Sequence, residues 1–351
     1  MKINNRLITQ LIAPACFSSL LLLANSACAE SSLNFVGELD TYLGYNRPAG
    51  GDAVESKTGV ESNGLTTSYL GVHGSHDLDN GLTAIASVEA FMRPDSGEIG
   101  RFEDDIMFAR AAYFGLKGDF GQFTIGRNTS LYFLSAIIFN PFGDSFSFSP
   151  MVLSSFGGGG LYGDTGWSDS LVYTTPTAGG FTTSFAYAFG EKAGDTSTNK
   201  IAANTFYKSG DFGFTAAIQK ISGTQSGATG LGPDDDQTDG IVGISYAIGD
   251  STVYAEYQVM RDKINGEGSV IDRDTLVLSA SIAVGKGAIY LGYGYTKIDT
   301  DGSDYDRNIY TIMYNLPLSK KLDLYVGYTN DDPEWTEKTG QTFGLGGRFR
   351  F

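Results

Sequence analysis

The chain has 351 residues, with 24 Lys and Arg against 40 Asp and Glu, and a formal net charge of −16. This balance argues against a nucleic-acid-binding protein, because phosphates must be neutralised by Lys and Arg. Beyond the N-terminal segment, no run approaches the roughly 18 apolar residues of a spanning helix, which excludes a helical-bundle membrane protein. The 47 glycines, 20 tyrosines and 23 phenylalanines suit a protein of many strands with aromatic belts.

The N-terminus has the three parts of an export signal. Lys2 and Arg6 form a basic region, residues 7–23 form an apolar region, and a small-residue cleavage site ends at Ala29, just before Glu30. We expect residues 1–29 to be removed, which leaves residues 30–351 as one barrel domain. Both cysteines leave with the signal, so the mature chain has no disulfide, and its formal charge falls to −18.

Apolar and polar residues alternate with a period of two along most of the mature chain. In residues 33–45 one face has Leu33, Phe35 and Leu43, and the other has Glu38 and Asp40. Apolar outside with charged inside is typical of a strand between lipid and a wet lumen.

The same alternation predicts sixteen strands. They are expected near 33–45, 65–76, 81–92, 106–117, 121–128, 168–176, 180–190, 199–208, 211–221, 238–248, 251–262, 272–284, 287–298, 304–316, 320–330 and 340–351. No segment shows helical periodicity. Short and long connections alternate, which favours a transmembrane antiparallel β-barrel with both termini on the short-turn, periplasmic side.

Residues 128–168 interrupt this rhythm. They contain many aromatic and aliphatic residues, and their only charged residues are Asp144 and Asp164. A disordered segment would be polar and charged, whereas an apolar long loop needs a sheltered place to pack. We therefore expect this loop to fold into the barrel and narrow its lumen.

The last strand, 340–351, is apolar on one face and ends in Phe351. An exposed apolar edge is an aggregation hazard, so the strand is expected to pair with residues 33–45 and close the barrel.

Several stretches, in order along the chain, resemble the trimeric Gram-negative general porins. They are Phe35-Val36-Gly37-Glu38-Leu39-Asp40, Phe108-Ala109-Arg110-Ala111-Ala112-Tyr113-Phe114-Gly115-Leu116, Gly121-Gln122-Phe123-Thr124-Ile125-Gly126-Arg127-Asn128, Asn140-Pro141-Phe142-Gly143-Asp144, Ser170-Leu171-Val172-Tyr173 and Phe349-Arg350-Phe351. The resemblance covers nearly all of the mature chain. It implies a homotrimer of sixteen-stranded barrels in which the third external loop folds inward.

The resemblance also implies a pore constriction where an acidic loop faces basic wall residues. Arg110 and Arg127 match the wall arginines of the family, Glu89 matches an inward carboxylate, and Asp144 matches the acidic loop position. Three departures suggest a weaker transverse field. Tyr69 stands where the family often has an arginine, a commonly basic wall position near Gly166-Trp167 is not basic here, and Asn140 replaces a frequent acidic residue.

The alternation of residues along the strands also predicts which charged side chains face the lumen. Arg110 has the parity opposite to Ala111 and Tyr113, which we expect to face lipid. An arginine in lipid costs about 2–4 kcal/mol at the midplane, so Arg110 is expected in the lumen, as part of the constriction or of a structural ion pair. Glu38 and Asp40 are expected to line the lumen from the first strand, whereas Arg101 is expected on the solvated surface.

Enzymatic and metal-dependent functions find little support. The chain has only His73 and His76 as histidines and no G-x-S-x-G or H-E-x-x-H motif. The acidic runs at 234–239 and 299–304 suggest calcium, but the second has only part of the EF-hand spacing and lacks its distant glutamate. Loose divalent-ion binding among lipopolysaccharide phosphates is therefore the favoured interpretation. We expect no catalytic site, cofactor or specific metal site.

The favoured function is a passive outer-membrane channel for small hydrophilic solutes and ions, with mild cation preference. Two alternatives remain open. In a sugar-selective porin, Tyr132, Phe133, Phe139 and Phe142 would form an aromatic track. In a surface adhesin, the acidic outer loops would bind a host partner.

Overall fold

The computed structural model describes residues 31–157, 160–161, 164–190, 199–223, 235–264, 269–300 and 302–351. The expected signal and its cleavage site between Ala29 and Glu30 lie outside these residues and stay predictions. Within the described residues, no helix has the length and apolar character needed to cross a membrane.

The described residues form strands, two short α-helices and one 3-10 turn. The first strands are β1 (Ser31–Arg47), β2 (Lys57–Ser62), β3 (Tyr69–Asp77), β4 (Thr83–Arg93), β5 (Glu98–Ile99), β6 (Ala111–Gly118), β7 (Gly121–Thr129), β8 (Gly166–Thr174) and β9 (Phe181–Ala188). The later strands are β10 (Lys200–Ser209), β11 (Phe212–Ser222), β12 (Asp236–Ile248), β13 (Ser251–Ile264), β14 (Ser269–Val284), β15 (Gly287–Thr300), β16 (Ser303–Pro317), β17 (Leu322–Pro333) and β18 (Gly340–Arg350). The helices are η1 (Asp79–Gly81), α2 (Leu131–Ile138) and α3 (Pro150–Ser155).

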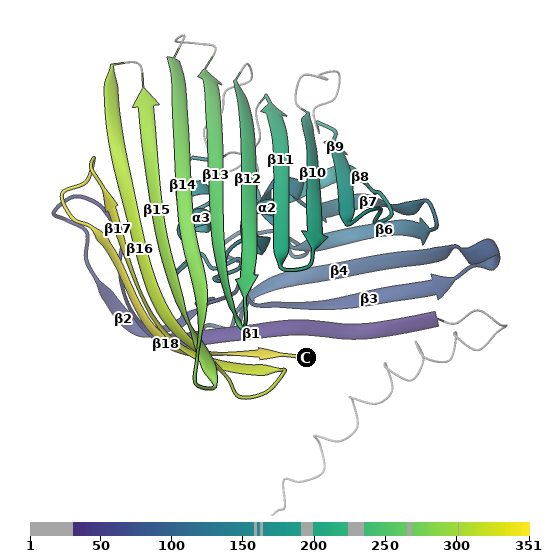
Figure 1. Cartoon of the computed structure of the whole chain (residues 1–351), viewed down its shortest axis with the longest axis horizontal. Helices are drawn as coiled ribbons and strands as arrows, with labels where there is room; N and C mark the ends of the chain where they lie inside the picture. The colour runs from purple at the N-terminus through teal and green to yellow at the C-terminus, as the bar shows by residue number, and fades with distance from the viewer. Residues whose placement is uncertain are drawn as a thin grey trace, which may run out of the picture.

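Sixteen of these strands, β1, β3, β4 and β6–β18, form a closed antiparallel barrel, as the alternation predicted (Figure 1). Closure comes from β1 and β18, which pair from Glu38 opposite Arg350 to Arg47 opposite Gln341. The two remaining strands are accessory. Strand β2 pairs with residues 41–46 of β1, next to the part of β1 that pairs with β3, and β5 pairs only with the end of β4. Closure leaves no unpaired edge, which every membrane-spanning sheet requires.

Alternate side chains separate an apolar outer surface from a polar inner surface. On β12, Val242, Ile244 and Tyr246 are about half exposed, whereas Ile241 and Asp239 on the opposite face are buried. The same pattern holds on β1 and β18, where the aromatic and aliphatic face is exposed. An outward apolar band and a polar interior are what a barrel in a bilayer needs.

The two ends of the barrel differ in their connections. At one end, called the short-turn end, neighbouring strands join through tight turns such as those at Gly249 and Gly285, whose φ values of 60° and 62° favour glycine. The other, long-loop end includes the segment between β1 and β3 and the segment between β7 and β8. The latter segment, residues 130–165, is called loop L3.

Two local predictions were wrong. The strand expected over 106–117 begins only at Ala111, so Arg110 precedes it. Loop L3 was expected to lack helices, but it contains α2 and α3. Each begins at a serine N-cap, Ser130 or Ser149, whose hydroxyl accepts from a backbone N–H in the first turn. Helices of eight and six residues are too short to show a clear helical period.

Candidate functional site

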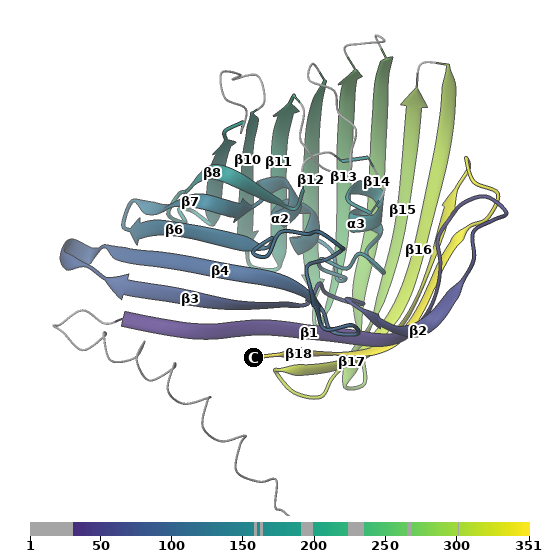
Figure 2. The ribbon, with the colours of Figure 1, turned by 180° about the vertical axis from the view of Figure 1, so that it is seen from behind.

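Loop L3 packs against the inner face of the barrel wall. Helix α2 contacts β10, β11 and β12, and α3 contacts β14, β15 and β16. Both ribbon views place the two helices on the concave side of these strands (Figures 1 and 2). The segment therefore lies against side chains that point into the barrel.

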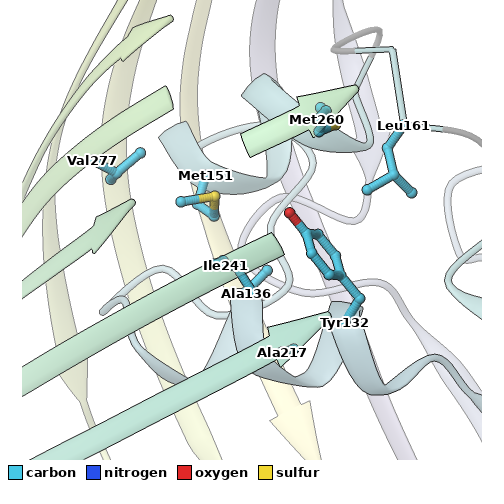
Figure 3. Close-up of a cluster of buried hydrophobic side chains, with 8 residues drawn as sticks. All are labelled: Tyr132, Ala136, Met151, Leu161, Ala217, Ile241, Met260 and Val277. Carbon is cyan, nitrogen blue, oxygen red and sulfur yellow. The ribbon is translucent and has the colours of Figure 1, made fainter. Parts of the chain in front are cut away.

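A buried apolar cluster joins the loop to the wall (Figure 3). Tyr132 and Ala136 of α2 and Met151 of α3 meet the inward residues Ile241 and Met260. All five are at most 2% exposed. Because each large apolar side chain contributes about 1.5–3 kcal/mol on burial, this contact accounts for much of the loop's attachment.

Glycines on the inner face of the wall leave space for the aromatic rings and the proline of loop L3. A methyl group at Gly292 of β15 would lie 2.8 Å from the ring of Phe142 and 2.9 Å from Pro150. One at Gly344 of β18 would lie 3.0 Å from the ring of Phe148. Larger residues at either glycine would displace the loop, so these strand glycines are part of its seat.

Hydrogen bonds fix the loop at separate points along the wall. Ser155 donates to Gln258 at 2.6 Å, and Asn204 donates to the backbone carbonyl of Leu131 at 3.1 Å. Arg307 of β16 donates to the backbone carbonyl of Leu153 at 3.2 Å and holds Asp331 with two bonds of 2.7 Å. These bonds satisfy polar groups that the apolar contact would otherwise bury unpaired.

Asp144, expected as the acidic face of a constriction, is bonded to the neighbouring connection. Its carboxylate accepts from the Thr66 hydroxyl at 2.5 Å and from the Thr67 backbone N–H at 3.3 Å. Ser145 donates to the Gly64 carbonyl at 2.6 Å. The middle of loop L3 is thus tied to the segment that leads into β3.

Asp40 does not line the lumen as a free charge. It has no exposed surface, and its carboxylate accepts backbone N–H bonds from Gly64, Leu65 and Thr66 at 2.9–3.1 Å. The Tyr325 hydroxyl also donates to it at 2.5 Å. The expectation of a pore-lining Asp40 is therefore corrected: its charge stabilises the turn on which Asp144 docks.

Arg110, Glu89 and Tyr69 come together on the inner face. Arg110 forms an ion pair with Glu89, and its guanidinium lies 3.7 Å from the centre of the Tyr69 ring. His73 also bonds Glu89, at 2.6 Å. Tyr69 therefore holds Arg110 by a cation–π contact.

The parity argument used for Arg110 was wrong. Glu89 pairs with Ala111, and Ser87 pairs with Tyr113. Ala111 and Tyr113 therefore share the face of Glu89 and Ser87, both of which are buried, while Phe114 is 55% exposed on the other face. Arg110 reaches Glu89 because it precedes the strand, where strict alternation does not apply.

Arg127 anchors the end of loop L3. It forms an ion pair with Asp164 and donates to the Ala109 carbonyl at 2.6 Å, and it is 8% exposed. Arg101 bonds the same Asp164 at 2.5 Å and Asp105 at 2.8 Å. Arg101 was expected on the solvated surface, but this network and its ring contacts with Phe91 and Phe102 half-bury it.

The electrostatics of this network favour ionised carboxylates. Burial acts to raise the pKa of Asp164, but hydrogen bonds and the charges of Arg101 and Arg127 outweigh it and hold that pKa below its usual range. The pKa of Asp105 is lowered in the same way, since bonds from Arg101 outweigh burial. The sequence marked Asp164 only as one of two charges in an apolar loop and gave no signal for its partners.

Glu38 lies near the short-turn end in a balanced cluster. Arg350 bonds Glu38 at 2.9 Å and Asp323 at 2.6 Å, and Arg348 bonds Asp323 at 2.9 Å. Two acidic and two basic side chains thus neutralise one another beside the seam between β1 and β18.

The aromatic residues of loop L3 do not form an exposed track. Tyr132, Phe133, Phe139 and Phe142 are between 0% and 7% exposed. The acidic runs are only partly within the described residues, because Asp234 and Asp301 lie outside them. Among the residues that are described, no group of three His, Cys, Asp or Glu is placed to hold a metal ion.

Comparison with known proteins identifies the family. A model of the Gram-negative porin family matches residues 15–334. The outer membrane porin protein 32 of Delftia acidovorans is 29% identical over 88% of this chain and 86% of its own length. An outer membrane porin protein of Bordetella pertussis is 23% identical over 93% of this chain and 96% of its own length.

Solved structures agree on the fold. The anion-selective porin from Comamonas acidovorans superposes with a TM-score of 0.75 at 23% identity, covering 92% of this chain and all of that one. A trimer form of OmpT from Vibrio cholerae gives 0.69 at 17% identity, covering 92% and 99%. A sixteen-stranded closed barrel, outward apolar bands and a family match over most of its length show that this chain belongs to the Gram-negative porins and crosses the outer membrane many times.

Proposed function

We propose that the chain forms a water-filled channel for passive diffusion of small hydrophilic solutes and ions, in which loop L3 sets the aperture. The observation that supports this proposal is the way in which loop L3 packs into the inner wall of the barrel. Phe142, Phe148 and Pro150 occupy hollows that Gly292 and Gly344 leave in the inner wall. A loop held at so many points inside a barrel narrows the bore without closing it and excludes solutes by size.

We further propose a mild preference for cations. Most inward arginines in the described chain, such as Arg127, Arg307 and Arg350, contact a carboxylate, so they add little net positive field. The mature charge of −18 then biases the vestibules towards cations. The structural neighbour described as an anion-selective porin favours the opposite ion preference. The reversal potential across a salt gradient in planar bilayers is therefore the deciding experiment. A clear anion preference would refute this part.

A homotrimer is the proposed assembly, supported by the trimer form of the OmpT structure from Vibrio cholerae. The proposed surroundings are outer-membrane lipid and lipopolysaccharide. The proposed role is transport without catalysis, cofactor or nucleic acid. Chemical cross-linking in native outer membranes, followed by gel electrophoresis, tests the assembly. A monomer band without dimer or trimer bands would contradict it.

A further inference from the structure

A pocket with both polar and apolar lining opens at the long-loop end of the barrel, beside the Arg307–Asp331 ion pair. Its volume is about 250 Å³. It is lined by three parts of the chain that lie far apart in sequence: the end of β1, loop L3 and the strands β17 and β18. The residues that define it here are Asn46, Arg47, Phe146, Leu153, Asp331 and Gln341.

The loop L3 side of this pocket is held in place. Ser145 accepts from the backbone N–H of Phe148 at 2.8 Å and of Ser147 at 3.3 Å, while its own hydroxyl bonds the Gly64 carbonyl. Phe146 lies within this turn. Its ring is therefore presented to the pocket by a fixed backbone, which lowers the conformational entropy lost on binding.

The strand side is equally fixed. Asp331 is clasped by Arg307, which also bonds the carbonyl of Leu153. Arg47 bonds the carbonyl and hydroxyl of Thr339 at 3.1 and 3.3 Å. These contacts leave a rigid lining of amide, hydroxyl and carboxylate groups beside Phe146 and Leu153.

We infer that this pocket binds a neutral polyhydroxylated ring, of the size of a monosaccharide, before it enters the bore. This inference rests on the proposed channel function and extends it to a substrate class. The amide of Asn46 and the hydroxyls of Thr329 and Thr342 offer both donors and acceptors, which suit the hydroxyl groups of such a ring. Phe146 and Leu153 offer apolar surface to the carbon face of such a ring, and a few polar groups on an apolar base are typical of small-molecule sites.

Charge favours a neutral ligand over an anion. Arg47 and Lys338 would attract carboxylates, but Lys338 pairs with Asp52, and the connections that frame the pocket also expose Glu55 and Glu337. Glu337 accepts from the backbone N–H of Asp52 at 3.0 Å, which keeps these two acidic groups together at the rim. An approaching anion meets this negative field first.

The test is binding of D-glucose to the purified full-length protein, followed by isothermal titration calorimetry and by the fractional block of current through single channels. Phe146→Ala and Asn46→Ala are each expected to weaken binding about fivefold, since each removes one modest contact. Phe120→Ala and Asn34→Ala, near the short-turn end, are the matched controls and should bind as wild type does. Each variant's block is measured against its own sugar-free current.

The outcomes separate this inference from the channel itself. Conducting channels that glucose neither binds nor blocks would overturn the inference and leave the channel intact. Glucuronate binding tenfold more tightly than glucose would overturn it in favour of an anion site. Equal effects of the pocket and control substitutions would also overturn it. Absence of any conductance in the wild type would refute the channel function instead.

Discussion

The carboxylate of Asp144 accepts a hydrogen bond of 2.5 Å from the hydroxyl of Thr66, which joins loop L3 to the segment leading into β3. The acidic residue of the loop is therefore engaged with a neutral donor, and the segment that donates is itself held by the buried Asp40. On the proposed function, the narrow part of the bore is therefore formed by two connections of the barrel and not by loop L3 alone.

Thr66→Val should release Asp144 while keeping the volume of the side chain. The freed carboxylate then adds negative field to the bore, so the reversal potential should shift towards stronger cation preference. Thr67→Val is the matched control, because Thr67 contacts Asp144 through its backbone N–H. A shift of equal size in both variants would contradict the role assigned to the Thr66 hydroxyl.

Glu89→Gln should leave Arg110 without its carboxylate partner and move the selectivity towards anions. The permeability ratio should change by roughly twofold to fivefold, because a unit charge at 4 Å in water is worth about 1 kcal/mol before salt screening. Raising the salt concentration should reduce the change. Arg110→Gln should shift selectivity in the opposite direction, and shifts of the same sign in both variants would count against a shared ion pair.

Gly292→Ala should destabilise the seat of loop L3. The added methyl group would lie 2.8 Å from Phe142, and overpacking of this kind costs about 1–3 kcal/mol. Limited proteolysis within loop L3 should become faster, while the barrel still resists denaturation. Gly59→Ala, where the nearest atom would lie 3.5 Å away, is the control. Unchanged proteolysis in Gly292→Ala would show that the wall does not hold the loop.

Acid should loosen the end of loop L3 only below the usual range of aspartate pKa values. The network of Arg101 and Arg127 lowers the pKa of Asp164. A carboxyl whose folded pKa is depressed stabilises the folded state above its unfolded pKa, and that contribution is lost as pH falls through the folded pKa. The rate of proteolysis at the end of loop L3 should therefore stay constant from neutral pH down to about pH 4 and rise below it. In Asp164→Asn the acid-dependent step should disappear; its persistence would assign the step to another group.

Much of the fold could be predicted because alternation is a local property. The parity of Leu43 and Asp40 on β1 and the apolar face of β18 follow from a period of two, and the closing pair follows from the need to cover both edges. Helices α2 and α3 could not be predicted in this way, since each is shorter than the window over which a helical period is measured. Accessory strand β5 has two residues and leaves no pattern at all.

The candidate site was less predictable because partners lie far apart in sequence. Arg127 and Asp164 are joined only once the barrel brings β7 beside the start of β8. Asp40 sits on the expected inward face, yet its burial depends on a turn at 64–66 that alternation does not describe. The hollows at Gly292 and Gly344 were also missed, although glycine on the inner face of a strand is the signal that could have found them.

The most direct test of the account is the single-channel conductance of the wild-type protein beside a variant in which residues 132–156 are replaced by a short Gly-Ser linker. Folding of both proteins is checked by their resistance to denaturation. If loop L3 narrows the bore, the shortened variant conducts more current and admits larger uncharged solutes than the wild type. Equal conductance and equal size exclusion in two folded barrels would contradict the central claim.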